Sequence, residues 1–79
     1  MKIHLDDRRF GKSLVWHFRV RDYLAVERAP GIVEVLPITS RDEEAARERT
    51  LSDLRRWASA NPAVSATPLE DDLQEDLRG

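Results

Sequence analysis

Residues 23–38 have the sequence YLAVERAPGIVEVLPI, in which two apolar stretches flank a proline and a glycine. The stretches at 23–28 and 32–38 are rich in the apolar and β-branched residues that favour strands. Pro30 presets φ for the second position of a turn, and Gly31 tolerates a positive φ at the third position. The segment therefore predicts a β-hairpin and, with it, an antiparallel sheet.

The register of this hairpin contains a conflict. If Ala29 faces Ile32 across the turn, Glu27 lies directly opposite Glu34, and like charges in that arrangement are unfavourable. Either the register differs, or two arginines of the preceding segment neutralise the pair. We favour a different register, because a Pro-Gly turn specifies its type only weakly and primed turns suit two-residue hairpins better.

The segment before the hairpin, SLVWHFRVR at 13–21, alternates with a period of two. The apolar positions are Leu14, Trp16, Phe18 and Val20, and the intervening ones are Val15, His17, Arg19 and Arg21. This pattern predicts a strand with one face in the core and the other in water. The chain must bend near Asp22, because one strand over 13–28 would be ~50 Å long, about twice the diameter of a domain this size.

Residues 40–61 predict one amphipathic helix. Ser40 and Glu43 have the spacing of a capping box, and Asn61 followed by Pro62 ends the pattern. Five residues share the stripe that would face a sheet: Ala46, Thr50, Leu54, Trp57 and Ala58.

These patterns predict an α+β fold, in which a small antiparallel β-meander is packed by one amphipathic helix and followed by a short C-terminal helix. The meander has three strands, or four if residues 2–5 (KIHL) also pair. Residues 1–61 form the core domain, 62–67 a linker, and 68–79 an acidic helix or tail. We place the rings of Trp16, Phe18 and Trp57 in the core.

The C-terminal segment contains helix-start residues and regularly spaced leucines, which a solvated terminus would not need. Thr67 and Pro68 suit the start of a helix, leucines recur every fourth residue from Leu69, and 69–79 has five acidic side chains against one arginine, a net charge of −4. A helix this short is marginal alone, so its leucines should dock on its own sheet, a second copy or another protein. We favour another protein. The partner-binding residues predicted here are Leu69, Glu70, Asp71, Asp72, Leu73, Glu75, Asp76 and Leu77.

A second candidate surface is the basic side of the predicted strand at 13–21. It would present His17, Arg19, Arg21 and Tyr23 to phosphates and bases. Against this alternative, the isoelectric point is about 5.6, the net charge is −2, and the two glutamates of the hairpin fall on the same predicted face.

Composition limits the chemistry that the chain can perform. It has 79 residues, enough for one domain, with no cysteine and only two histidines. It has no Gly-x-Ser-x-Gly and no glycine-rich phosphate loop, so we predict no enzyme activity and no catalytic, cofactor or metal site. Without a long apolar run or a leader-like N-terminus, we expect a cytoplasmic protein with no membrane association.

The function expected from these features is a non-enzymatic protein-interaction module. Small, acidic, cysteine-free chains of bacterial or phage type are often antitoxins, immunity proteins or anti-defence inhibitors. Such a chain would block a partner protein, for example a nuclease or another nucleic-acid-binding protein, by steric and acidic-surface contacts. A homodimer and a nucleic-acid-binding module are the alternatives.

Overall fold

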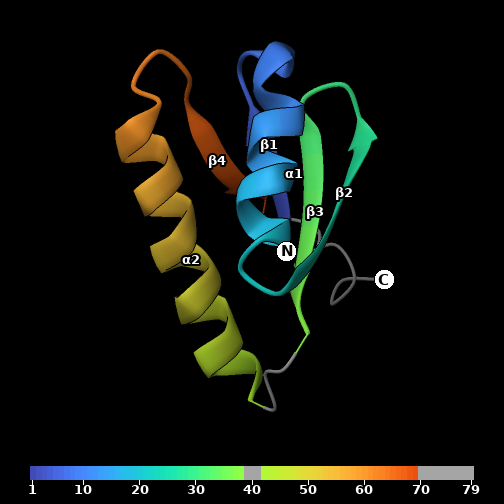
Figure 1. The fold of residues 1–79 in the computed structure, drawn as a ribbon, viewed down its shortest axis with the longest axis vertical. Helices are drawn as coiled ribbons and strands as arrows, with labels where there is room; N and C mark the ends of the chain where they lie inside the picture. The colour runs from blue at the N-terminus through green and yellow to red at the C-terminus, as the bar shows by residue number, and fades with distance from the viewer. Residues whose placement is uncertain (39–41, 70–79) are drawn as a thin grey trace, which may run out of the picture.

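The computed structural model describes residues 1–38 and 42–69. A short 3-10 helix spans Arg8–Phe10. The other elements are β1 (Lys2–Leu5), α1 (Gly11–Arg19), β2 (Tyr23–Ala29), β3 (Ile32–Pro37), α2 (Glu43–Ala60) and β4 (Ala66–Leu69). Within the described residues, four strands form one sheet in the order β2-β3-β1-β4, with all neighbours antiparallel (Figure 1). The α+β prediction with an antiparallel sheet is confirmed, and the connectivity is the βαββαβ order of ferredoxin-like domains.

Both helices pack on the same face of the sheet. The buried core takes side chains from every strand but β4 and from both helices: Ile3, Leu5, Leu14, Phe18, Tyr23, Ala25, Val33, Val35, Leu54, Trp57 and Val64. Along the strands, these positions alternate with side chains that point to the opposite side. No described helix covers that opposite side, which we call the open face.

The predicted strand over 13–21 is wrong, because Gly11–Arg19 forms α1. The two-residue period there contains two pairs at i and i+4, and such pairs stack on one side of a helix. Leu14 and Phe18 form the buried pair, whereas Trp16 and Val20 are 67% and 55% exposed. Trp16 is therefore a surface residue, while Phe18 lies in the core as predicted. Since β1 and β2 are parallel with β3 between them, the chain needs a crossover connection, and α1 supplies it.

The predicted bend near Asp22 is confirmed, but the strand after it faces the other way from the prediction. Asp22 adopts a φ of 67° in the turn between α1 and β2. Tyr23 then points into the core, and Leu24 points to the open face. A shift of one residue exchanges the two faces of a strand, so carrying the alternation of the wrongly predicted strand at 13–21 past Asp22 assigned β2 the wrong face.

The hairpin forms as predicted. Its register differs from the one that would place Glu27 opposite Glu34, and this is the alternative that we favoured. Ala29 pairs with Ile32, but a bulge beyond Glu27 places Val26, not Glu27, opposite Glu34. The bulge therefore removes the conflict between the two glutamates. Gly31 takes the positive φ of 82° at the turn.

In helix α2 the buried side is the predicted one, but the N-cap residue differs from the prediction. Thr50, Leu54 and Trp57 are buried, as the stripe required. The N-cap is Asp42, whose side chain accepts a hydrogen bond from the amide of Glu44 at 3.1 Å. The predicted cap, Ser40, lies outside the described residues.

Strand β4 replaces the end of the predicted linker and the first turn of the predicted C-terminal helix. Pro68 lies opposite Ile3 in this edge strand, a position where the missing amide hydrogen is tolerated. Val64, in the segment predicted to be a featureless linker, is buried in the core. The rest of the predicted C-terminal helix, residues 70–79, lies outside the described residues.

Candidate functional site

The open face is a regular array of side chains set by the strand register. One row contains Leu24 and Leu36; the next contains Val26, Glu34, Lys2 and Leu69; the third contains Ile32, His4 and Thr67. Side chains directly opposite each other in antiparallel strands lie close enough to touch. The open face therefore has an apolar side on β2 and β3 and a more polar side on β1 and β4.

The apolar side is exposed. Leu24 is 60% exposed, Leu36 58% and Val26 43%; Ile38, which continues the alternation just after β3, is 58% exposed. We call these four residues the apolar corner. Single exposed apolar residues are ordinary on protein surfaces, but contiguous exposed groups mark interaction sites. The apolar corner is therefore the strongest candidate for a working surface among the described residues.

An ion pair borders the apolar corner. The Nε of Arg28, on the bulge, lies 2.5 Å from Oε1 of Glu34. The Arg28 hydrogen bond lowers the pKa of the Glu34 carboxyl below its ordinary value. Lys2 lies opposite Glu34 on the other side. The corner thus adjoins two cationic side chains and one carboxylate.

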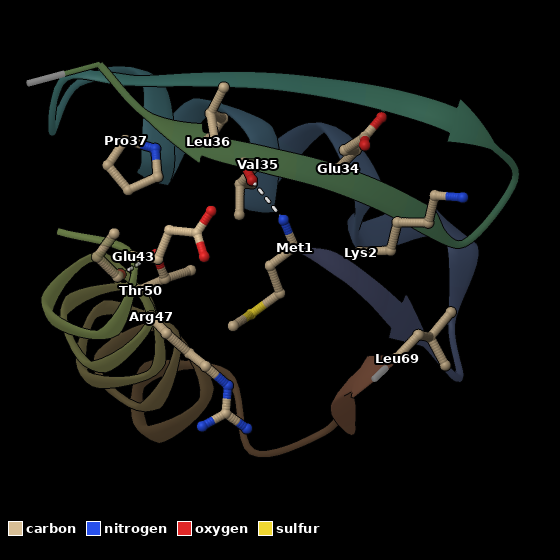
Figure 2. Close-up of a pocket in the computed structure, with 11 residues that line it drawn as sticks. Met1, Lys2, Glu34, Val35, Leu36, Pro37, Glu43, Arg47, Thr50 and Leu69 are labelled. Atoms are coloured by element: carbon tan, nitrogen blue, oxygen red, sulfur yellow. Dashed lines mark hydrogen bonds between the residues drawn. The ribbon is translucent and has the colours of Figure 1, made fainter. Parts of the chain in front are cut away.

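A cavity of about 420 Å³ opens where β3 runs past the start of β1. Figure 2 shows Met1 between β3 and α2, with its amino group donating a hydrogen bond to the carbonyl of Val35 at 2.9 Å. Residues that line the cavity include Met1, Val35, Leu36, Pro37, Thr50 and Leu69. Glu43, Ala46 and Arg47 of α2 also line it, so the cavity lies between the end of the sheet and α2.

The predicted basic row does not lie along one strand. His17 and Arg19 lie on α1, Arg21 lies in the turn after it, and Tyr23 is buried in β2. Arg19 donates through Nε to the carbonyl of Ala25 at 3.0 Å. The segment from which we inferred a basic strand face is therefore a helix followed by a turn.

Three of these residues instead belong to a polar network that joins α1, β2 and α2. The hydroxyl of Tyr23 donates to Oδ2 of Asp53 at 2.7 Å, and Nε2 of His17 lies 2.8 Å from the carbonyl of Asp53. Arg49 donates to the carbonyl of Arg21 at 2.7 Å and stacks over the Tyr23 ring. Burial, followed by the hydrogen bond to Asp53, raises the pKa of Tyr23 to about 12. Among the described residues, every buried polar side-chain atom has a partner, so this network holds elements together.

His17 gives the network a pH dependence. Burial lowers the pKa of His17 below 6.5, its ordinary value, so the folded state favours the neutral ring. Its contribution to stability is complete above pH 6.5 and is lost as the pH falls from there through the lower pKa of the folded state. Urea unfolding at pH 7.5 and pH 5 should show this loss. His17→Gln keeps an N–H donor but does not titrate, so the fall in unfolding free energy should be smaller in that variant; an equal fall would contradict the role of His17.

Of the predicted tail site, only Leu69 lies within the described residues. It ends β4 on the open face, opposite Lys2. The other seven, Glu70, Asp71, Asp72, Leu73, Glu75, Asp76 and Leu77, lie outside them. In the described part of the chain, no group of three or more His, Cys, Asp or Glu side chains is placed to hold a metal ion, and no helix is long and apolar enough to cross a membrane.

The reasoning from sequence missed the apolar corner, although a signal was present. Residues 23–26 (YLAV) and 32–36 (IVEVL) are almost continuously apolar, whereas a strand with one wet face should alternate. Continuous apolar runs are typical of strands covered on both faces. Comparisons with models of protein families, with curated proteins and with solved structures found no match to the chain.

Proposed function

We propose that the protein is a non-enzymatic protein-interaction module of the inhibitor type, which binds a partner protein through the open face and blocks it sterically. The observation that carries the proposal is the apolar corner, where Leu24 and Leu36 lie directly opposite each other and are both more than half exposed. Apolar side chains in the centre of such a patch supply most of the affinity of protein interfaces.

The composition of the hairpin supports a covered open face. In β2, Tyr23 and Ala25 already face the helices, so the core does not need Leu24 and Val26. Exposed apolar side chains on an edge strand also promote aggregation, and proteins usually replace them with charges. Their presence is explained if the open face has an occupant.

The border of the apolar corner indicates the chemistry of the partner. The partner needs an apolar projection beside groups that can meet Arg28, Glu34 and Lys2. The acidic residues after Leu69 favour a partner with basic groups near that projection, since opposite charges steer association. A nuclease or another nucleic-acid-binding protein has this chemistry, because an acidic segment can imitate a phosphate backbone.

Affinity capture with matched variants tests the proposal. Leu36→Glu places a charge in the apolar corner, and Trp16→Glu places the same charge on a residue of α1 that is also more than half exposed. Circular dichroism should show both variants to be folded. We expect a protein retained by the wild type to be retained by Trp16→Glu and lost with Leu36→Glu. Loss with Trp16→Glu and retention by Leu36→Glu would move the binding surface to the helices and refute the proposal.

A further inference from the structure

We propose that the protein has a second binding surface, on the helix side of the sheet, which holds a single-stranded nucleic acid by its phosphates and by one stacked base. The surface, which we call the helix seam, consists of Trp16, Arg21, Arg49 and Arg56 beside the contact between α1 and α2. It lies on the side of the sheet away from the open face, so it does not depend on the proposed function.

The two helices lie side by side and run antiparallel (Figure 1). Three hydrogen-bonded contacts set their register, and each joins α1 or the turn after it to α2: Ser13 with Trp57, His17 with Asp53, and Arg21 with Arg49. The part of α2 from Arg49 onwards therefore lies alongside α1. The acidic residues of the first half of α2 precede this contact: Glu43, Glu44 and Glu48.

Three guanidinium groups gather at the helix seam. Arg21 donates through Nη1 to the carbonyl of His17 at 2.8 Å, and Arg49 donates through Nη2 to the carbonyl of Arg21 at 2.7 Å. Burial lowers the pKa of His17, and the charges of Arg21 and Arg56 lower it further, so Arg56 also lies near this ring. The Asp53 side chain is only 15% exposed. The arginines therefore dominate the charge that the seam presents to solvent.

Trp16 supplies an aromatic surface beside these cations. At about 100° per residue, it lies on the side of α1 opposite the buried Leu14 and Phe18. It is 67% exposed, so the core does not use its ring. Proteins that bind single strands combine a cationic surface that follows the backbone with aromatic side chains on which bases stack. The helix seam has both of these features.

The combination favours a single strand over other anionic partners. Phosphates alone would use the arginines but not the indole, and the bases of a duplex are already stacked on each other. An anionic membrane would require a broad apolar side, whereas the exposed side of α1 has only Trp16 and, at its end, Val20. Arg49 and Arg56 are separated by about 10 Å along the helix axis, which is the length of about three nucleotides at ~3.4 Å each.

The acidic net charge of the chain does not oppose this site. Residues 1–69 carry twelve basic and ten acidic side chains, a net charge of +2. Over α1, the turn after it and residues 49–60, six basic side chains are present against two acidic ones. The positive charge is therefore concentrated where the two helices meet, and such a concentration attracts phosphates.

Fluorescence anisotropy of a labelled single strand of about 12 nucleotides, titrated with the purified full chain, tests the site. We expect a Kd of about 10⁻⁴–10⁻⁶ M that weakens steeply as salt is added. Trp16→Ala should raise Kd at least about fivefold, because a stacked base loses its platform. Leu36→Ala removes a side chain of the open face that is also more than half exposed, and it should leave Kd within about twofold.

Two charge variants of α2 form a matched pair. Arg56 lies near His17, whereas Arg55 is exposed on the side of α2 opposite Asp53, at about 200° from it. Arg56→Ala should reduce the slope of log K against log salt by about 0.7, as for one phosphate of a single strand. Arg55→Ala should leave the slope unchanged.

An abasic strand of the same length separates stacking from charge. It should bind more weakly than the normal strand to the wild type, and equally to the wild type and Trp16→Ala, because the two changes remove the same contact.

The proposal would be overturned by a Kd above ~1 mM at about 50 mM salt, by an unchanged Kd in Trp16→Ala, or by equal binding of the normal and abasic strands. Binding to anionic lipid vesicles that Trp16→Ala abolishes, without binding to the strand, would assign the seam to a membrane instead. All components are purified, so these results are distinguishable from a failure of the capture experiment.

Discussion

Replacing Phe18 with alanine is expected to lower the free energy of unfolding by about 3–5 kcal/mol. The Phe18 side chain is completely buried, and its ring packs edge-on against Tyr23 with centroids 4.7 Å apart. Because small domains have only about 5–15 kcal/mol of stability in total, this loss should leave the variant close to unfolded at 37 °C. Urea denaturation followed by circular dichroism measures it.

The matched control is Trp16→Ala. In the helix α1, Trp16 points away from the sheet, so its removal should change the unfolding free energy by no more than about 0.5 kcal/mol. In a strand, Trp16 and Phe18 would share the core face and both substitutions would be severe. A large fall in the unfolding free energy of Trp16→Ala would therefore contradict the helical assignment of α1 and favour a strand there.

Replacing Trp57 with alanine is the second change expected to be severe, at about 3–5 kcal/mol. Trp57 lies where α2 meets α1: its ring packs edge-on against Phe10 at 6.2 Å, and its indole N–H donates to Oγ of Ser13 at 3.2 Å. It is 3% exposed. Its loss leaves a cavity at the contact between the two helices, which thermal melting should report as a large fall in Tm.

Two further variants separate packing from the hydrogen bond. Trp57→Phe keeps a buried ring and removes the indole donor, so it should cost clearly less than Trp57→Ala. Arg56→Ala, at the neighbouring exposed position of α2, should have almost no effect. If Trp57→Ala melted within a degree or two of the wild type, the contact between α1 and α2 would not be part of the core.

The parts of the fold that could be predicted from sequence are those with local signals. The hairpin has its proline and glycine, and α2 has a long helical stripe bounded by Asn61. The conflict between Glu27 and Glu34 even predicted a different register, which the bulge provides. In each case, the residues that specify the element lie within it.

The α1 segment could not be assigned in this way, because its apolar residues satisfy two periods at once. Leu14 and Phe18 fit one side of a helix and also one face of a strand. The choice depends on the distant pairing of β1 with β3, which requires a crossover between β1 and β2. Similarly, Thr67 and Pro68 resemble a helix start, but pairing with β1 holds them in an edge strand.

The candidate site depends on the same long-range information. The sequence placed basic residues on an exposed strand face, and α1 and the turn after it divide them between several elements. The apolar corner arises only when β2 and β3 pair with Leu24 opposite Leu36 and both helices lie on the other side of the sheet. The only sign of it in the sequence is that polar and apolar residues do not alternate in these two strands.

The most direct test of the open face as the binding surface is the dissociation constant of the captured protein for Leu24→Glu and Trp16→Glu. Leu24→Glu should raise Kd at least about 30-fold, which corresponds to the ~2 kcal/mol of an interface hot spot. Trp16→Glu should leave Kd within about twofold, because α1 takes no part in the contact. A Kd that is unchanged by Leu24→Glu and raised by Trp16→Glu would contradict binding through the open face.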